Sequence, residues 1–432
     1  MFSNKSDRVP ALSSSPDSRD RAGPHYGRRV QIPRAGYVVI IAFTLLIFLN
    51  VAVPKGGIKS SGLPLTWGYV ALAIAAITSI PLAIASFRLT RKSAIAGLNY
   101  VTVGVLILSK WYNAGQVGPQ DIVWMVDLFA IPFSILIVLM AQIDKIPDSY
   151  ITISIVRCIR LTVIWGLFNF ALYALTKNYI EIPYVTINAA DAGQIFEKYN
   201  SRGELMKLVS TYNNGNIYGD CMVILGPLYL TFEASRFMKS LFIAAVVFTL
   251  SRTAWLGLSL ILVTMFALGL IHYRRIWLGA IGVAMAILMV FGVLPSMGWT
   301  PIDIFDQSLN GRLESLSDIV VSFWGSDHIV INELTYLGIF NSFGIVGSII
   351  VIWAIIFPIV TNIGAVPRMS KLQRSAMAGI GSYVVIATID GALQFIPVIA
   401  LFSFVSALSI RPQNLPATPA SIARSKGQSG EM

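Results

Sequence analysis

Long apolar stretches recur along this chain, and each is long enough to cross a lipid bilayer. A helix needs about 20 apolar residues to span a hydrocarbon core roughly 30 Å thick, and such stretches recur from residue 36 to residue 410. Of the 432 residues, 55% are hydrophobic and 12% are charged, whereas soluble domains carry about 25% charged residues. The pattern predicts an all-α polytopic membrane protein and excludes an ordinary soluble one.

The predicted spans follow directly from these stretches. They are 36–53, 65–87, 94–110, 121–141, 152–175, 218–235, 276–296 and 334–361, together with two longer runs, 240–271 and 375–410. The run 240–271 has basic residues before and after it, and Lys and Arg are enriched in cytoplasmic loops. We therefore expect it to turn back on itself at Ser251-Arg252-Thr253, and 375–410 to turn at Asp390-Gly391. The total is about 12 transmembrane helices.

Charge also sets the predicted orientation and organisation. Residues 1–35 are rich in Ser, Pro, Asp and Arg, which predicts a disordered cytoplasmic tail. Residues 36–410 are predicted to form a single transmembrane bundle, and 411–432 a second cytoplasmic tail. The net charge of +11 is explained by basic inner loops, so no nucleic-acid partner is expected. Large periplasmic loops are predicted at 177–217 and 297–333, where function usually lies.

Charged residues are sparse on the predicted outer side. A guanidinium at membrane depth costs at least a few kcal/mol, so Arg252 at its hairpin tip needs a partner. Arg312 begins a predicted surface helix over Gly311–Trp324, and Glu333 opens the span 334–361. Because the planar fork of Arg matches phosphate oxygens, two arginines beside a carboxylate suggest a diphosphate site. Further candidates on this side are His328 as a base, and Asp127, Asp318 and Asp390 as supporting carboxylates.

Each of these side chains is also consistent with a purely structural role. Arg252 is also consistent with an ion pair to Asp127 or Asp390. Arg312 is also consistent with a surface cation. Glu333 is also consistent with an N-terminal cap that interacts with the dipole of its helix. A lone loop histidine such as His328 is usually solvated. The sequence contains no Walker loop, dinucleotide fingerprint or zinc motif, so neither a cofactor nor a metal is expected.

Four segments together resemble a known family. They are "YNNGNIYG" (Tyr212–Gly219), "SRTAWLGL" (Ser251–Leu258), "NGRLES" (Asn310–Ser315) and "NELTYLGIFNSFGIVG" (Asn332–Gly347). In order and spacing they are similar to motifs of the bacterial O-antigen ligase and polysaccharide polymerase family, whose core corresponds to about residues 210–360 here. Two positions depart from the pattern: Thr253 stands where the family has Gly, and Glu333 where the ligases have His. An acidic residue in this region is more typical of the polymerases.

The resemblance implies a metal-independent membrane glycosyltransferase of the bacterial inner membrane. It would be a polysaccharide repeat-unit polymerase that transfers a glycan from undecaprenyl diphosphate to a lipid-linked acceptor unit at the periplasmic face. The implied partners are a polyprenyl-diphosphate-linked oligosaccharide and membrane lipid, with a chain-length regulator and a flippase as candidate protein partners.

The implied catalytic residues are Glu333 as the base and His328 in reserve, while Arg252 and Arg312 bind the diphosphate. Two alternatives stay open. One is an O-antigen-type ligase that transfers the glycan to lipid A core. The other is a transporter or flippase of lipid-linked sugars.

Overall fold

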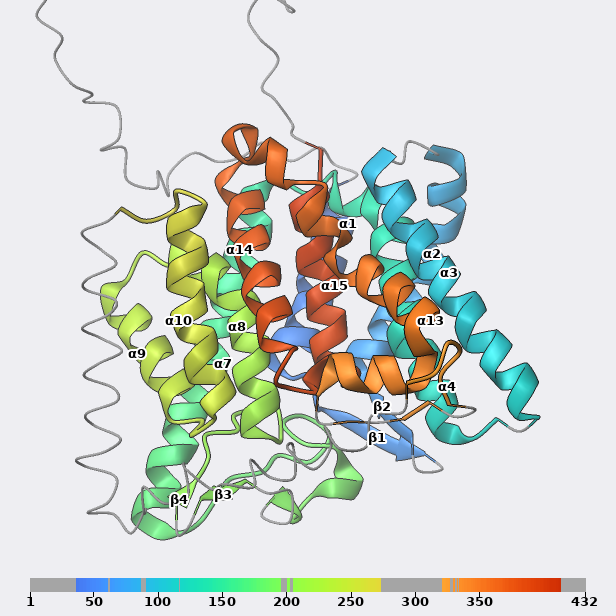
Figure 1. The fold of residues 1–432 in the computed structure, drawn as a ribbon. Helices are drawn as coiled ribbons and strands as arrows, with labels where there is room; N and C mark the ends of the chain where they lie inside the picture. The colour runs from blue at the N-terminus through green and yellow to red at the C-terminus, as the bar shows by residue number, and fades with distance from the viewer. Residues whose placement is uncertain are drawn as a thin grey trace, which may run out of the picture.

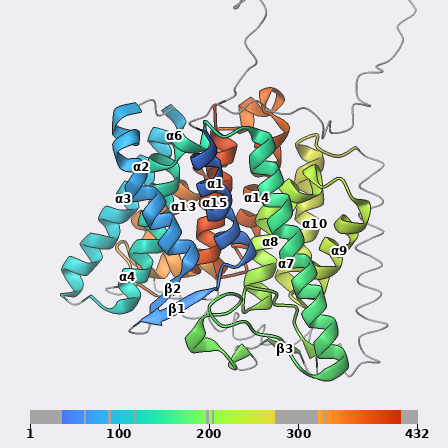
Figure 2. The ribbon, with the colours of Figure 1, turned by 180° about the vertical axis from the view of Figure 1, so that it is seen from behind.

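The chain folds into a mostly helical bundle (Figures 1 and 2). The computed structural model describes residues 36–60, 63–86, 91–115, 117–195, 200–202, 205–272, 321–326, 329–330, 332 and 334–412. The predicted tail 1–35, the predicted span 276–296 and all but the first two residues of the tail 411–432 lie outside the described residues.

The first half of the bundle contains α1 (Gly36–Ile47) with η2 (Phe48–Ala52), α2 (Trp67–Ser86), α3 (Arg91–Ala114), the series α4 (Pro119–Met125), η3 (Val126–Ala130), α5 (Ile131–Phe133), η4 (Ser134–Val138) and α6 (Met140–Ile143), and α7 (Asp148–Thr176). The second half contains α8 (Gly215–Phe232), α9 (Arg236–Val247), α10 (Arg252–Ala267), α13 (Thr335–Val360), η10 (Ile363–Arg368), α14 (Lys371–Ile386), η11 (Ala392–Gln394) and α15 (Ile396–Ile410). The predicted spans among the described residues are therefore mainly helical.

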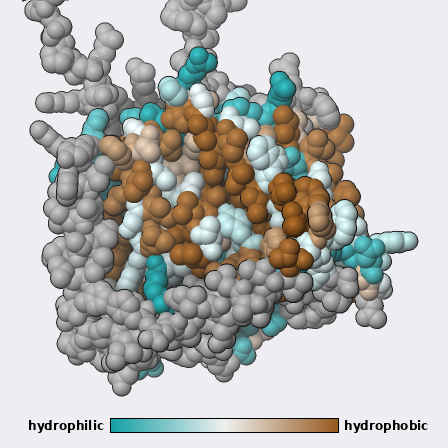
Figure 3. Space-filling model, in the orientation of Figure 1, coloured by the Kyte–Doolittle hydropathy of each residue, from teal (hydrophilic) through white to brown (hydrophobic). Residues whose placement is uncertain are grey.

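Four helical stretches are both long and apolar enough to cross a membrane. They are Arg91–Ala114, Asp121–Val138, Asp148–Thr176 and Thr335–Arg368. Shorter apolar helices join them, and hydrophobic side chains cover much of the described surface in Figure 3. The chain thus has the character of a membrane-embedded protein, but the described residues do not show the predicted 12 spans. The 12 residues of α9, for example, rise only about 18 Å.

Both long apolar runs are interrupted as predicted, although the first break lies just before the predicted one, since Arg252 and Thr253 already belong to α10. In the first run, α9 ends at Val247 and α10 begins at Arg252, and between them Leu250 adopts a φ of 51°. In the second run, α14 ends at Ile386 and the chain turns through Asp390 before α15. A polar break between two apolar arms was therefore a sufficient signal in both cases.

The described chain begins and ends at the same end of the bundle, which we call the terminal end. Arg411 donates from Nη1 to Oδ1 of Asp148 at 2.9 Å, and from Nη2 to the carbonyl of Ile146 at 2.5 Å. Ile146 in turn lines a cavity together with Val38, near the start of α1. Both termini of the described chain therefore emerge on one side, whichever membrane face that is.

The opposite end, which we call the loop end, carries structure that hydropathy did not predict. Two short antiparallel hairpins lie there: β1 (Gly57–Ser60) with β2 (Leu63–Thr66), and β3 (Ser201–Arg202) with β4 (Leu205–Met206). The connection from α7 to α8 is otherwise largely irregular, as predicted for 177–217.

Hydrogen bonds fasten the α7–α8 connection to several helices. Tyr212 donates from its hydroxyl to the carbonyl of Val51 at 2.8 Å, and the N–H of Leu208 donates to the carbonyl of Phe248. Ser210 donates from Oγ to the carbonyl of Thr162 at 2.7 Å. The connection is thus a fixed floor across the loop end, because it contacts α7, η2 and the α9–α10 tip at once.

Helix α13 is broken at Gly344, where φ is 65° and ψ is −166°. A Cβ at Gly344 would clash with the backbone of Phe323 and Gly325, and a Cβ at Gly325 would clash with Ser342 and Gly344. The carbonyls of Ser322 and Phe323 accept the N–H groups of Ile345 and Val346. Glycine is needed on both sides of this contact because the two backbones touch directly.

This contact corrects one prediction. Residues 321–324 were expected to end a surface helix over Gly311–Trp324, but they are not helical. The carbonyls of Ser322 and Phe323 instead accept N–H groups of the broken helix α13. Phe323 and Trp324 are nonetheless 66% and 71% exposed, as residues at a lipid surface would be. Residues 311–320 lie outside the described residues.

Replacing Gly344 with alanine should destabilise the protein. The left-handed φ and the clash with the Phe323–Gly325 backbone predict a loss of about 1–3 kcal/mol in the free energy of unfolding. Denaturation in detergent micelles measures this loss. Gly364→Ala is the matched control, since nothing lies within 4 Å of a Cβ there. Equal stability of the two variants would contradict the tight contact.

Cysteine labelling tests the two ends of the bundle. Tyr112 at the loop end is 88% exposed and Ile363 at the terminal end is 60% exposed, while the native Cys158 and Cys221 are buried. We expect a membrane-impermeant maleimide to label Tyr112→Cys in spheroplasts, and Ile363→Cys only after permeabilisation. The reverse pattern would show that the predicted orientation is wrong.

Candidate functional site

Three of the seven predicted site residues fall within the described part of the chain. They are Arg252, Asp127 and Asp390, whereas Arg312, Asp318, His328 and Glu333 lie outside the described residues. The site can therefore be built from the first three and from the groups that surround them.

Arg252 is the first residue of α10 and is half-buried at the tip between α9 and α10. Helix α8 lies against this tip, because a Cβ at Gly219 would be 2.6 Å from the Cβ of Ala254. The carbonyl of Phe248, which lies at this tip, accepts a hydrogen bond from the N–H of Leu208. The segments Tyr212–Gly219 and Ser251–Leu258, which are separated by more than 30 residues, are thus neighbours in the fold.

Asp127 lies within the bundle on the π-helical segment η3 and is 0% exposed. Neither of its carboxylate oxygens has a hydrogen-bond partner among the described residues. Buried polar groups are nearly always hydrogen-bonded, and an ionisable residue inside a membrane usually marks a functional site. Single turns of π-helix are likewise frequent at functional sites. Asp127 therefore stands out as a buried carboxylate that makes no hydrogen bond among the described residues.

Lys55 is the cation whose charge acts on Asp127. It follows η2, is half-buried, and acts also on Cys221 of α8. The ion pair of Arg252 with Asp127 or Asp390 stays a prediction, and Lys55 is a further cation near Asp127. Hydropathy alone does not predict this placement, because Lys55 lies in a short polar link between two apolar stretches.

Asp220 is a second buried carboxylate, and our sequence analysis missed it. It lies in the second turn of α8 and is 0% exposed. The signal was available, since Asp220 directly follows the Tyr212–Gly219 segment and stands inside the predicted span 218–235. Its charge acts on Cys221 and on the hydroxyl of Tyr383 in α14.

Asp390, in the turn that follows α14, is the third carboxylate of this group. Its charge acts on Tyr383, and its Oδ1 accepts the N–H of Ala392 at 2.8 Å. The carbonyl of Asp390 accepts both the hydroxyl of Thr335, at 2.6 Å, and the N–H of Thr335, at 3.3 Å. Helix α13 therefore begins against Asp390, and Thr335 is two positions after Glu333 in the sequence.

We call Lys55, Asp127, Asp220, Tyr383 and Asp390 the loop-end cluster. Lys55 acts on Asp127, while Asp220 and Asp390 both act on Tyr383, and the helices of Asp220 and Tyr383, α8 and α14, pack against each other. Lys55 and the nearby Arg252 are cations that can bind an anionic group. The carboxylates of the cluster can accept a proton. Among the described residues, no group of three or more His, Cys, Asp or Glu side chains is arranged to hold a metal ion.

Comparisons with protein-family models, with curated proteins and with solved structures find no match for this chain.

A double-mutant cycle tests the coupling between Lys55 and Asp127. Lys55→Met should destabilise the protein because it leaves a buried carboxylate without its cation, and the added change Asp127→Asn should restore part of the loss. For neighbouring charges we expect a coupling of about 0.5–3 kcal/mol in the free energy of unfolding in detergent.

Lys59→Met is the matched control for this cycle, since Lys59 is an exposed lysine on β1. Its combination with Asp127→Asn should be additive. An additive result for Lys55 as well would mean that the two charges do not interact.

Proposed function

We propose that this protein is a membrane glycosyltransferase that builds a polysaccharide from lipid-linked units. It would transfer a glycan from undecaprenyl diphosphate to a lipid-linked acceptor, as a repeat-unit polymerase. One observation carries the proposal: segments far apart in the sequence that resemble motifs of the O-antigen ligase and polymerase family meet at one end of the bundle. Tyr212–Gly219 adjoins Ser251–Leu258 through the Gly219–Ala254 contact, and the described part of Asn332–Gly347 begins against Asp390.

The proposed reaction exchanges one bond for another. An acceptor hydroxyl attacks the anomeric carbon of the donor glycan, a glycosidic bond forms, and the bond from that carbon to the diphosphate oxygen breaks. Glu333 takes the proton of the hydroxyl, with His328 in reserve, as a general base does. Arg252 and Arg312 stabilise the charge that develops on the departing diphosphate. The activated donor bond supplies the driving force, so no nucleotide is consumed.

The proposal also fixes a topology. About 12 spans would cross the bacterial inner membrane, with both termini cytoplasmic and the loop end facing the periplasm. The floor formed by the α7–α8 connection would then lie at the depth of lipid headgroups, where the diphosphate of a membrane-bound carrier is found.

A transporter or flippase of lipid-linked sugars is the second candidate, and the buried carboxylates favour it. Asp127 and Asp220 are both 0% exposed within the bundle, and charged groups inside a membrane often mark substrate or proton pathways. The two functions differ in their products, because a transporter moves its substrate across the membrane without forming a new glycosidic bond.

Reconstitution separates these functions. Proteoliposomes supplied with undecaprenyl-diphosphate-linked oligosaccharide should yield a ladder of longer glycans on gels. A single transfer to added lipid A core, without a ladder, would indicate a ligase instead. Translocation without any new bond would indicate the transporter.

Arg252→Lys tests the diphosphate role in the same assay. The change keeps the charge but loses the two-pronged geometry, so the rate should fall by roughly 10- to 100-fold. Arg236→Lys is the control, an exposed arginine at the start of α9. A normal ladder from Arg252→Lys would argue against a bidentate contact, and a normal ladder from Glu333→Gln would show that the assigned base is wrong.

A further inference from the structure

Asp127 is a buried carboxylate that the proposed transfer reaction does not use. It lies on η3, which together with η4 places two π-helical turns within the apolar stretch Asp121–Val138. It is 0% exposed, and neither carboxylate oxygen has a hydrogen-bond partner among the described residues. An ionised carboxylate inside a membrane protein needs a compensating partner, or else it is neutralised by a proton. The role of Asp127 therefore depends on what compensates its charge.

The polar groups near Asp127 come from the root of the hairpin β1–β2. Lys55 lies just before β1, and its charge acts on Asp127. The charge of Asp127 acts in turn on the hydroxyl of Tyr69, in the first turn of α2. Thr66 ends β2, where it pairs with Gly57, and is 2% exposed. Its hydroxyl, like Asp127, has no hydrogen-bond partner among the described residues.

The helices that pack against η3 add little charge around Asp127. Helices α5 and α15 contain no titratable side chain, and α4 contributes only Asp121, in its first turn. Helix α3 approaches η3 through Gly104, where a Cβ would be 2.8 Å from the ring of Phe129. The cation whose charge acts on Asp127, Lys55, comes from outside these helices. The titratable side chains of α3 are Arg91, Lys92, Tyr100, Lys110 and Tyr112.

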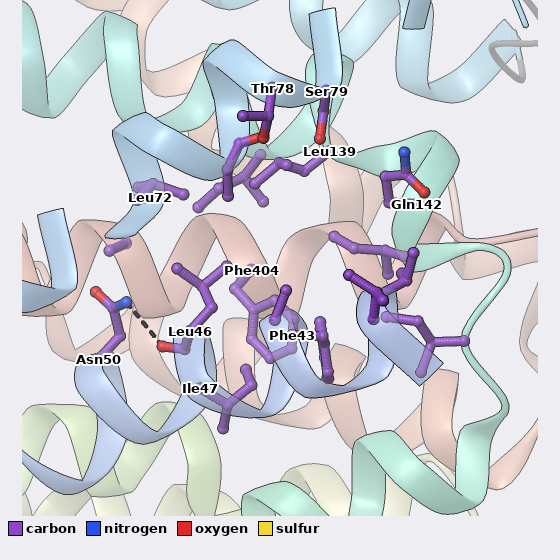
Figure 4. A pocket seen from close by; sticks show the side chains of 18 of the residues that line it. Phe43, Leu46, Ile47, Asn50, Leu72, Thr78, Ser79, Leu139, Gln142 and Phe404 are labelled. Carbon is purple, nitrogen blue, oxygen red and sulfur yellow. Dashed lines mark hydrogen bonds between the residues drawn. The ribbon is translucent and has the colours of Figure 1, made fainter. Parts of the chain in front are cut away.

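The polar surroundings of Asp127 lie on its loop-end side. Lys55 is half-buried there, so solvent reaches this link. Toward the terminal end the same span buries apolar side chains, among them Leu128, Ile131 and Ile135. The cavity of about 260 Å³ between α1, α2, the η4–α6 segment and α15, where Phe43 and Phe404 lie, is lined by none of the polar groups near Asp127 (Figure 4). Among the described residues, the polar route to Asp127 therefore starts at the loop end.

The chemistry of this site favours a proton over other small ligands. The two carboxylate oxygens of Asp127 are acceptors, so they suit a cation or a hydrogen-bond donor. Lys55 already brings a positive charge near them, which disfavours a metal ion. A proton needs only one oxygen atom and no set of ligands, and it removes the charge that burial makes costly.

We propose that Asp127 is a proton-binding site inside the bundle, loaded from the loop end, and that a proton and Lys55 are alternative partners for its carboxylate. A hydronium ion at the loop end gives its proton to one oxygen of Asp127, which becomes a neutral carboxylic acid, and water remains. The hydroxyls of Thr66 and Tyr69 are the side-chain groups suited to pass this proton. The inference goes beyond the proposed function and does not depend on it, since proton binding requires no glycan.

Infrared difference spectroscopy of the full-length protein in proteoliposomes, without substrate, tests this assignment. A protonated carboxylic acid has a carbonyl stretch that an ionised carboxylate lacks. On acidification we expect such a band to appear and to shift in D₂O. Asp127→Asn should remove it. Asp121→Asn is the matched control and should leave it unchanged, because Asp121 lies on the same stretch but accepts the N–H of Gly118 at 2.9 Å. A band that persists unchanged in Asp127→Asn would overturn the proposal.

Lys55→Met tests the competition between the lysine and the proton. Without this cation the carboxyl should take up its proton at higher pH, so the midpoint of the band should rise by about one pH unit or more. Lys59→Met, which removes an exposed lysine on β1, should leave the midpoint unchanged.

Thermal melting in detergent checks that these variants fold, and the midpoint in Lys55→Met decides the question if Asp127→Asn does not fold. An unchanged midpoint in Lys55→Met would contradict the competition. A carboxylate that stays ionised over the whole pH range would show a permanent ion pair and overturn the proposal.

Discussion

The rest of the structure depends on the burial of one helix, α8. Every residue from Gly215 to Tyr229 except Asn216 is buried, because α7, α9, α10, α14 and α15 all pack around it. A helix enclosed in this way cannot carry a charge without neighbours that compensate it. Asp220 on this helix therefore determines what the surrounding elements must supply. At the loop end its charge acts on the neighbouring Cys221 and on the hydroxyl of Tyr383 in α14.

The floor and the broken helix α13 have a related role at the loop end. The α7–α8 connection is tied to three helices, and α13 starts on the carbonyl of Asp390. The break at Gly344 lets the first part of α13 lie across the bundle while its second part runs along it (Figure 1). Short backbone contacts thus hold together the segments that the sequence marks as important. A site made from distant segments needs such fixed supports, since small displacements of reacting groups reduce rates sharply.

Sequence reasoning succeeded where hydropathy and charge act over many residues. The helical class, the helix positions and the turns near Arg252 and Asp390 all follow from apolar length and basic flanks. It failed where a few local contacts determine the structure. The hairpin β1–β2, the π-helical turn at Asp127 and the placement of Lys55 near Asp127 have no periodic signature. The predicted helix over Gly311–Trp324 rested on periodicity, whereas Ser322 and Phe323, which are not helical, make backbone contacts with α13. Asp220 had a signal that was passed over: a carboxylate within an apolar span.

The central claim is that glycosidic bonds form at the loop end with loss of a lipid diphosphate. The most direct measurement is the stoichiometry of that loss in proteoliposomes that contain the purified protein and lipid-linked oligosaccharide. Mass spectrometry counts free undecaprenyl diphosphate while the glycan is sized in parallel. The account predicts that one undecaprenyl diphosphate is released for each glycosidic bond formed. Movement of intact lipid-linked oligosaccharide across the membrane, with no diphosphate released, would contradict it.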